Sequence, residues 1–402
     1  MEEVRARQAA AGSGVVGRLV IIDALRAVAA LLVVLNHSDL GARSPGAVRW
    51  LVPVGRLGYT GVGLFLVISG FSIHLRWAAT RDASFSGVAF WRRRLVRLYP
   101  TYYAALATIG LTLTIVSGPG QIAAERAARE HLPLWFAAAN HLVVIGGNFT
   151  VVALLPQAWS LALEEQIYAL YSVAARFVRD LRPMRLLMAS LVLSLVWRLG
   201  VSVLTPAATA RNLMYFQVPS RLFEWVLGLV AVEAYVGNVR LPEMAKRLEV
   251  GVGLLLVSGY LGLQPAGFLL LNSHRFAVSG VLLDPLFGIA FFVCLNSLVS
   301  GEQRLLASPA RPILHLLGTV GLSSYSMYLL HPLILRVAAL IVPPHGLVGR
   351  GAAWLAVIFG SYGFYLVVER RFIARARRPR QSCEVASHEA TSHHDELMPV
   401  RA

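Results

Sequence analysis

The sequence is poor in charged residues and in cysteine. Asp, Glu, Lys and Arg make up 14% of its 402 residues and hydrophobic residues make up 56%, whereas about a quarter of the residues of a soluble protein are charged. This composition excludes an ordinary soluble globule and is typical of a protein that crosses a membrane several times. The two cysteines, Cys294 and Cys383, are too few for a disulfide framework.

Long apolar runs recur along the chain and predict an all-α, polytopic integral membrane protein with about ten transmembrane helices. The expected spans are residues 19–39, 58–77, 98–117, 158–177, 186–205, 219–237, 249–266, 276–299, 313–340 and 351–368. His141 and Gly146-Gly147-Asn148 interrupt a further apolar run at 132–155. We therefore expect a re-entrant or surface segment there.

The basic residues predict the orientation. The net charge is +16, and Lys246 is the lone lysine among 37 basic residues. If both termini are cytoplasmic, about 25 of these residues fall on the cytoplasmic side, as the positive-inside rule requires. The first apolar run has no small-residue cleavage site, so we expect it to remain as a span in a bacterial plasma membrane. Such a basic surface favours membrane lipids and polyanionic substrates over nucleic acid as partners.

One membrane domain is expected over residues 18–377, between disordered tails at 1–17 and 378–402. His393 and His394 in the second tail could bind a metal, but a solvated tail is the simpler interpretation. The sequence therefore predicts no metal site and no tightly bound cofactor. It does not specify an oligomeric state.

Arg26 and His37 lie within the first expected span. Eleven helical residues advance about 16 Å and turn about 20° past three full turns, so the two side chains share one face at different depths. Ionisable groups in hydrocarbon are costly and mark functional paths. The alternative is that Arg26 extends to the membrane surface and His37 lies among the lipid headgroups.

Five short motifs follow one another along the chain. They are LRAVAALLVVLNH at 25–37, GVGLFLVISGF at 61–71, FWRRRLVRLYPTYY at 90–103, WSLALEEQIYALY at 159–171 and GLSSYSMYLLHP at 321–332. From about residue 19 to 372 the chain resembles the acyltransferase 3 family of integral membrane O-acyltransferases, which modify sugars of cell envelopes and macrolide antibiotics. The resemblance implies an acyl-CoA, such as acetyl-CoA, as co-substrate and a hydroxylated sugar or a macrolide as acceptor.

The chain departs from the family pattern at three positions. Gly63 stands where many members carry an acidic residue, and Leu66 and Ile167 stand where phenylalanine is usual. A polar contact found elsewhere in the family is therefore expected to be absent.

The resemblance implies that Arg26 and His37 are needed for activity. Acyl transfer to an alcohol needs a base that takes the hydroxyl proton, and imidazole is suited to this because its pKa lies near 7. We therefore expect His37 to be the general base. Arg26, nearer the cytoplasm, is expected to hold oxygen atoms of the acyl donor.

A run of arginines precedes the third expected span. Arg92, Arg93 and Arg97 are expected to bind the phosphates of acyl-CoA, because clustered guanidiniums bind phosphate oxygens in pairs. Arg93 and Arg97 lie one helical turn apart. Anchoring of the membrane topology is the simpler role, and Leu98-Tyr99-Pro100 is expected to start the span.

The fourth expected span carries Trp159, Glu164 and Tyr168. Glu164 is expected either to orient His37, as the acid does in a catalytic triad, or to bind acceptor hydroxyls, with Trp159 and Tyr168 beside it. Pairing of Glu164 with an arginine such as Arg221 is the structural alternative. Arg221 and Glu224 are themselves spaced for an ion pair within one helix.

The ninth expected span places Ser324, Tyr328 and His331 on one stripe, with His331 at a depth similar to that of His37. These three residues are expected to bind the acceptor. A competing mechanism would use Ser69 or Ser324 as an acyl carrier, although Ser69 lacks the Gly-x-Ser-x-Gly context of a nucleophile elbow.

Together these features predict a membrane-bound O-acyltransferase that transfers a short acyl group from acyl-CoA to a sugar or macrolide hydroxyl. One alternative is an envelope polysaccharide O-acetyltransferase of the same family. Another is a transporter or flippase for a lipid-linked sugar, which would show inverted repeats and helices broken at the membrane midplane.

Overall fold

The structure is a computed structural model that describes residues 18–38, 51–79, 85–116, 155, 157–175, 182–204, 216–263, 278–342 and 347–377. Every regular element in these ranges is helical, and no strand occurs among them. The expected tails at 1–17 and 378–402, and nearly all of the segment at 132–155, lie outside the described residues.

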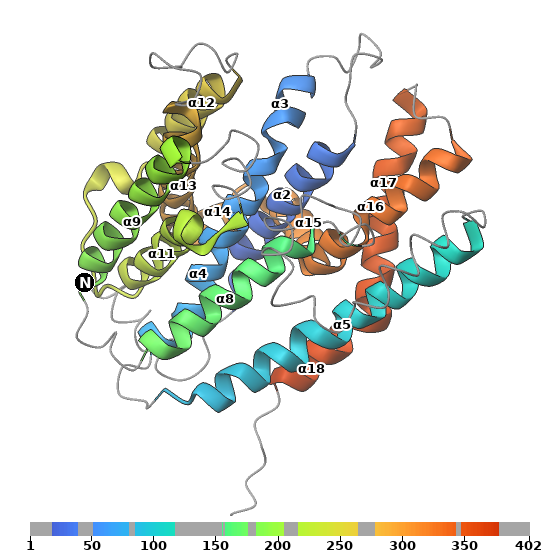
Figure 1. The fold of residues 1–402 in the computed structure, drawn as a ribbon, viewed down its shortest axis with the longest axis horizontal. Coiled ribbons are helices and arrows are strands. Elements are labelled where there is room, and N and C mark those ends of the chain that lie inside the picture. The colour runs from blue at the N-terminus through green and yellow to red at the C-terminus, as the bar shows by residue number, and fades with distance from the viewer. Residues whose placement is uncertain are drawn as a thin grey trace, which may run out of the picture.

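The helices are labelled as in Figure 1. Their bounds are α2 Val20–His37, α3 Leu51–Leu57, α4 Gly61–Ala79, α5 Gly87–Val116, α8 Ala158–Ala174, α9 Pro183–Leu204, α11 Val218–Tyr235, α12 Leu248–Leu263, α13 Val278–Ser300, α14 Glu302–Leu306, α15 Arg311–Leu322, α16 Ser324–Ile341, α17 Leu347–Phe364 and α18 Arg370–Arg377. Short 3₁₀ turns lie at Gly58–Thr60 and Glu243–Lys246, and a π-helical turn lies at Tyr365–Glu369.

Six segments are long and apolar enough to cross a membrane, as expected for a multi-pass membrane protein. Within the described ranges they are Val20–His37, Val52–Ala78, Pro183–Leu204, Val281–Ser300, Ser324–Ile341 and Val348–Ala376. Helices also occupy the other expected positions, but α8 and α12 are shorter and α5 and α11 carry more charge. The count of ten spans and the cytoplasmic position of both termini stay predictions.

Two helix boundaries differ from the prediction. The expected span at 313–340 is two helices, because the chain leaves α15 at Leu322 and starts α16 at Ser324. The Ser323 hydroxyl donates to the carbonyl of Val320 (2.8 Å), a local bond that competes with helix continuation. The third helix starts at Gly87, where the Ser86 hydroxyl accepts the N–H of Ala89 (3.2 Å). Pro100 therefore lies inside α5 and not in its first turn.

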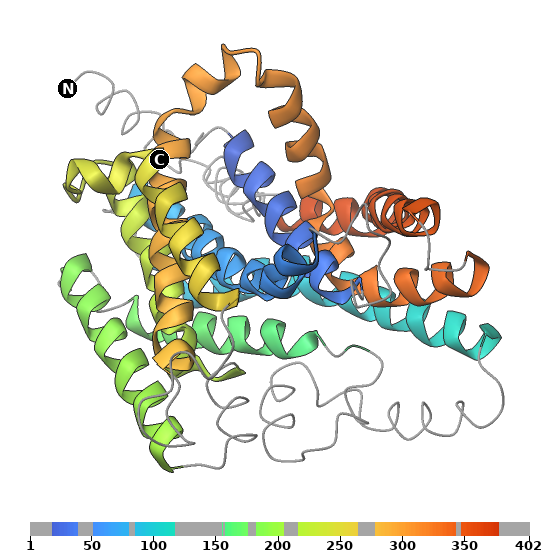
Figure 2. The same ribbon diagram turned by 90° about the horizontal axis from the view of Figure 1, so that it is seen from above.

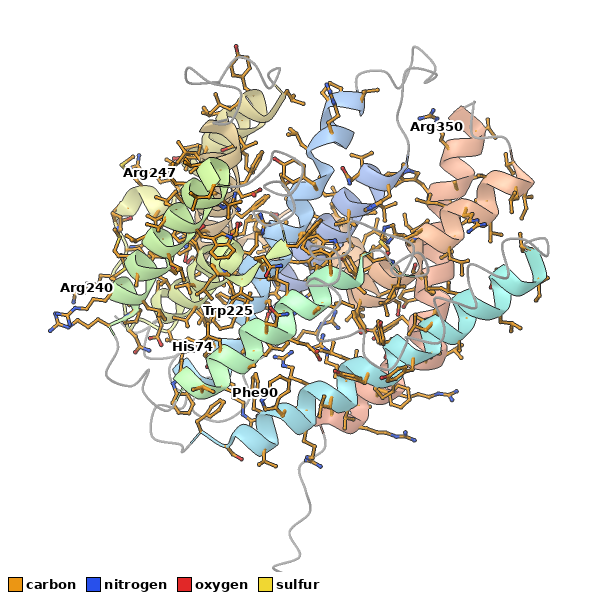
Figure 3. All side chains as sticks on the ribbon, in the orientation of Figure 1. His74, Phe90, Trp225, Arg240, Arg247 and Arg350 are labelled. Atoms are coloured by element: carbon orange, nitrogen blue, oxygen red, sulfur yellow. The ribbon has the colours of Figure 1, made fainter. Side chains whose placement is uncertain are left out.

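In Figures 1 and 2, α2 and α4 run through the middle of the molecule. On one side α9, α11, α12 and α13 form a group; on the other, α16 and α17 lie near α5, which pairs with α18. The turn at Gly58 lies against Asn36, while Ser72 contacts Arg26, so α4 is antiparallel to α2. Arg240 and Arg247 project from the periphery in Figure 3, whereas His74 and Trp225 are buried.

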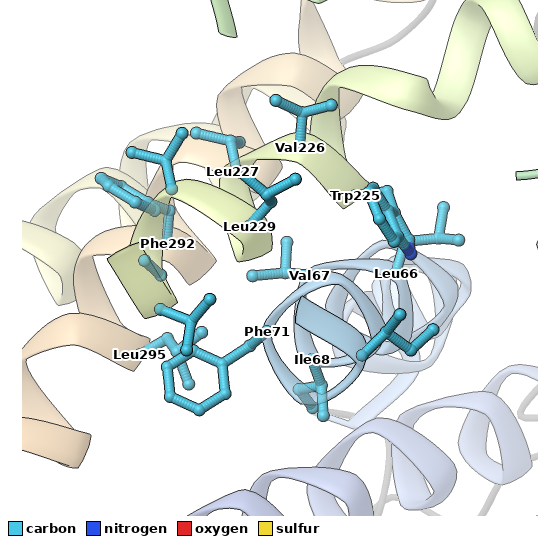
Figure 4. Close-up of a cluster of buried hydrophobic side chains, with 14 of the residues drawn as sticks. Leu66, Val67, Ile68, Phe71, Trp225, Val226, Leu227, Leu229, Phe292 and Leu295 are labelled. Carbon is cyan, nitrogen blue, oxygen red and sulfur yellow. The ribbon is translucent and has the colours of Figure 1, made fainter. Parts of the chain in front are cut away.

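The core lies where α4 meets α11 and α13. Val67 and Phe71 of α4 pack against Leu229 of α11 and Leu295 of α13, as Figure 4 shows. A Cβ atom on Gly70 would lie 1.9 Å from the carbonyl oxygen of Trp225, and one on Gly228 would lie 1.9 Å from that of Val67. The two backbones therefore touch through glycines, which is how small residues stabilise helix pairs in membranes.

Buried ion pairs join α9, α11 and α13. The guanidinium of Arg221 lies 3.1 Å from Glu224 and 2.9 Å from Asp284, and Arg198 lies 2.8 Å from Asp284. The predicted pair within α11 is confirmed. Gly63 of α4 faces this group, because a Cβ there would lie 3.4 Å from a nitrogen of Arg221. Gly63 provides no carboxylate at this position, and the carboxylates beside Arg221 come from Glu224 and Asp284.

Candidate active site

A wide cavity of about 970 Å³ lies between α2, α4, α5 and the C-terminal helices. Arginines dominate its charged lining, and Asp23 and Glu369 are the carboxylates that oppose them. The seven arginines are Arg18, Arg26, Arg76, Arg93, Arg94, Arg97 and Arg370. A cavity with this excess of positive charge is suited to a polyanion.

Arg26 is oriented by two helices. Its guanidinium donates to Asp23 on α2 (2.9 Å) and to the hydroxyl of Ser72 on α4 (2.9 Å). Asp23 also accepts from Arg18 (2.5 Å). Arg26 is thus held at the wall of the cavity, and Ser72 is a partner that the sequence did not indicate.

The arginines of α5 point in different directions. Arg93, Arg94 and Arg97 line the wide cavity, whereas Arg92 lies in an outer groove with Trp91 and Leu95. The structure therefore does not bring Arg92 together with the other predicted donor-binding residues. Burial and the neighbouring guanidiniums hold the pKa of Arg93 below its usual range, a sign of crowded positive charge.

Arg94 received no separate role from the sequence. Its guanidinium lies over the ring of Tyr168 (5.1 Å) and over that of Phe90 (5.8 Å). These cation–π contacts hold the charge at the cavity wall. Which arginine of the run faces inward depends on how α5 packs against its neighbours, which the sequence pattern does not determine.

A narrow cavity of about 120 Å³ continues from the wide one. The two share six lining residues: Arg26, Ser72, Ile73, Arg94, Arg97 and Ser324. Beyond them the walls are largely apolar, with Val62, Phe65, Leu66, Ile68 and Leu161. Polar groups come from Ser69, Ser160, Glu164, Tyr168, Tyr325 and Tyr328. A charged entrance thus leads to a small chamber whose walls combine apolar side chains with hydroxyl groups and the carboxylate of Glu164.

Glu164 is the acid of the narrow cavity. Its carboxylate accepts hydrogen bonds from the hydroxyls of Ser69 and Tyr168. Among the described residues, Glu164 makes no hydrogen bond to His37. A triad-like arrangement of Glu164 with that histidine is therefore not formed. The alternative pairing with Arg221 is wrong, because Arg221 lies against Glu224 and Asp284.

His37 and His331 come together from α2 and α16. The Nε2 of His331 lies 3.3 Å from the Nδ1 of His37, and the ring centroids are 5.0 Å apart. Neither histidine lines the two cavities. Tyr328 connects them to the narrow one, because it lines that cavity and its ring lies 6.1 Å from that of His331.

Of the remaining predicted residues, three line a cavity and Trp159 does not. Ser324 lies where the two cavities join, and Tyr168 and Tyr328 line the narrow one. Tyr328 is hydrogen-bonded to Ser160 and donates to the carbonyl of Gln157 (3.0 Å). Trp159 lines neither cavity and packs against Phe216, with ring centroids 4.4 Å apart.

Glu369 is a further residue that the sequence did not indicate. It ends the π-helical turn, lines the wide cavity and accepts from the N–H (3.2 Å) and hydroxyl (2.5 Å) of Ser326. Its carboxylate therefore binds the first turn of α16, where the helix has free N–H groups. Irregular π-helical turns are often found at functional sites.

Comparison with known proteins identifies the relatives of this architecture. Residues 19–369 match Acyl_transf_3, described as an acyltransferase domain. The O-acetyltransferase OatA of Staphylococcus aureus (strain NCTC 8325 / PS 47) is 26% identical over 329 residues, covering 79% of this chain and 50% of that protein. BcsY of Komagataeibacter xylinus is 27% identical over 357 residues, covering 87% of this chain and 81% of BcsY.

A peptidoglycan O-acetyltransferase OatA of Listeria monocytogenes serovar 1/2a is 24% identical over 239 residues, covering 56% of this chain and 35% of that protein. The chain thus spans about half the length of the Staphylococcus aureus relative. No solved structure matches it. Because the family match extends over most of the described helices and both cavities, this multi-pass membrane protein belongs to the acyltransferase 3 family.

Proposed function

We propose that the protein transfers a short acyl group from an acyl-CoA thioester to a hydroxyl of a sugar or macrolide. The observation that supports this most is the pair of joined cavities. Seven arginines surround a space of about 970 Å³ that leads into a chamber of about 120 Å³ with mostly apolar walls. Coenzyme A has the matching chemistry, with phosphates at one end and a slender arm that ends in the thioester.

Arg93, Arg94 and Arg97 would bind the donor phosphates, because guanidinium pairs with phosphate oxygens through two parallel hydrogen bonds. Arg26 would contact the arm where the cavities join. Since Asp23 and Ser72 hold its guanidinium in place, little conformational entropy is lost when the donor binds.

His37 would act as the general base. Its imidazole takes the proton of the acceptor hydroxyl, the oxygen attacks the thioester carbon, and the carbon–sulfur bond breaks to release the thiolate of coenzyme A. The imidazolium then returns the proton to the sulfur. His37 follows Arg26 by eleven positions in α2, which corresponds to about 16 Å along the helix. This distance is comparable to the length of the donor arm.

The acceptor would reach His37 from the side away from the arginines, where the histidine is exposed. Tyr168, Tyr328 and Ser324 offer hydroxyls to a polyol near the narrow cavity. The name of the Listeria monocytogenes relative favours a peptidoglycan-type sugar as one acceptor class. A macrolide is the other.

Purified protein in lipid vesicles would test the function. Acyl-CoAs of different chain length are combined with a panel of macrolides, sugars and peptidoglycan fragments, and products are identified by mass spectrometry. An acylated acceptor with stoichiometric free coenzyme A supports the proposal, and the acceptor that reacts decides between the two classes. Movement of an unmodified lipid-linked sugar across the vesicle membrane, without acylation, would instead identify a flippase.

A further inference from the structure

His331 is completely buried and lies beside His37, 294 positions away in the sequence. Their closest nitrogens, Nε2 of His331 and Nδ1 of His37, are 3.3 Å apart. A buried ring nitrogen needs a hydrogen-bond partner. The acceptors around the two rings therefore determine which nitrogens carry hydrogen.

Carbonyl oxygens determine the tautomer of His331. Its Nδ1 lies 2.9 Å from the oxygen of Tyr328 and 3.1 Å from that of Met327. Because carbonyls only accept, Nδ1 carries the hydrogen. Pro332 favours this arrangement: it lacks an N–H, so the carbonyl of Tyr328, four residues earlier in α16, has no helical donor. In the neutral ring, Nε2 then holds a lone pair.

The same reasoning applies to His37. Its Nδ1 lies 2.8 Å from the carbonyl oxygen of Val33, so this nitrogen also carries a hydrogen. The Val33 carbonyl already accepts the backbone N–H of His37 within α2. The lone pair on Nε2 of His331, 3.3 Å away, is a second acceptor for the same hydrogen. This leaves Nε2 of His37 unprotonated and able to accept a proton.

We propose that His331 is a positioning residue for the transfer reaction, holding His37 with Nδ1 protonated and Nε2 available as the base. The inference rests on the proposed function for the reaction, but the proton arrangement follows from the contacts alone. When His37 takes the acceptor proton, its Nδ1–H still points at a neutral acceptor, and the positive charge strengthens that bond. An aspartate has the corresponding role in a serine-protease triad.

Glu164 does not fill this role, because its carboxylate is bonded to Ser69 and Tyr168. Buried imidazole in place of a carboxylate also avoids placing a full negative charge within the membrane, which would be costly without a cation beside it.

Three variants test the inference. His331→Gln keeps an acceptor near the position of Nε2, His331→Phe keeps a flat ring without an acceptor, and His315→Ala is a control at an exposed histidine of α15. We expect His331→Phe to lower kcat about 10- to 100-fold, the usual cost of losing an orienting partner, with both KM values unchanged. His331→Gln should recover most of kcat, and His315→Ala should match the unchanged protein.

A spectroscopic measurement gives an independent result. In bilayers, ¹⁵N-histidine NMR should show His37 with Nδ1 protonated and Nε2 unprotonated in the unchanged protein and in His331→Gln. His331→Phe keeps the Val33 carbonyl but loses the second acceptor, so a larger share of the Nε2-protonated tautomer is expected there. His37→Asn identifies the signals by their loss. An unchanged kcat or an unchanged His37 spectrum in His331→Phe overturns the inference. The inference is also overturned if His331→Phe and His331→Gln lose kcat equally and the KM for donor or acceptor rises. Absence of acyl transfer by the unchanged protein would refute the proposed function, while the spectrum still decides the tautomer.

Discussion

Arg26 donates to the hydroxyl of Ser72 at 2.9 Å, and this bond ties α2 to α4 at the point where the wide and narrow cavities join. Arg26 is therefore not a lipid-facing anchor. It forms part of the passage between the arginine-rich entrance and the chamber that contains Glu164. Substitutions in this passage should therefore affect the donor, the acceptor and the base separately.

Replacing His37 with Ala should abolish transfer and leave donor binding intact. Loss of a general base typically lowers the rate by about 10²- to 10⁴-fold. His37 lines neither cavity, so the Kd for an acyl-CoA analogue, measured by calorimetry in detergent, should not change. Near-normal turnover by His37→Ala would remove His37 from the base role.

Arg93 and Arg97 should affect the donor, whereas Arg92 should not. The first two line the wide cavity and Arg92 faces the outer groove. Loss of one charge-assisted hydrogen bond to phosphate should raise the KM for acyl-CoA about tenfold in Arg93→Ala or Arg97→Ala, with a larger effect at low salt. Arg92→Ala is the matched control, and its KM should stay unchanged. If all three behave alike, the run serves only as an anchor.

Glu164→Gln should raise the KM for the acceptor about tenfold, because an amide is a weaker acceptor than a carboxylate for hydroxyls in a site of low polarity. The KM for the donor should not change. Glu165→Gln is the neighbouring control: Glu165 accepts from Tyr99 (3.3 Å) and lines neither cavity. A fall in kcat alone in Glu164→Gln would point to orientation of the base instead.

Gly228→Ala should destabilise the protein. The added Cβ would lie 1.9 Å from the carbonyl oxygen of Val67, and overpacking of this kind costs roughly 1–3 kcal/mol or more. Gly200→Ala in α9 is the control, because no atom lies within 4 Å of its Cβ position; it should gain about 0.5–1 kcal/mol from the lower backbone entropy of alanine. Thermal melting in one detergent compares the two, and equal melting temperatures would contradict the close packing of α4 and α11.

The sequence predicted contacts best where the residue type and its helical spacing both indicate the same partner. Arg26 stands out because an arginine in an apolar run needs a partner, and the pair Arg221 and Glu224 follows from helix geometry alone. The likeness in depth of His37 and His331 could be predicted by counting residues. Their direct contact required the packing of α2 on α16, which pattern analysis does not determine.

Other features depend on tertiary structure. The sequence could not show that Arg92 faces an outer groove while Arg93 lines the cavity, because the packing of α5 against its neighbours determines which face of the helix lines the cavity. Ser72 and Glu369 are ordinary residue types that gain a role only through partners distant in sequence. The interruption at Ser323 was missed because hydropathy is continuous across it.

The glycine contact between α4 and α11 determines which walls of the narrow cavity can adapt to different donors. Ser69 immediately precedes Gly70, where a Cβ atom would lie 1.9 Å from the carbonyl oxygen of Trp225, so no side chain fits between α4 and α11. The α4 wall is therefore rigid, since moving it would require moving α11 as well. Differences in acyl length among donors must be accommodated by the facing side chains of α8 and α16, such as Leu161 and Tyr328, and selection for a longer acyl group would act on those positions first.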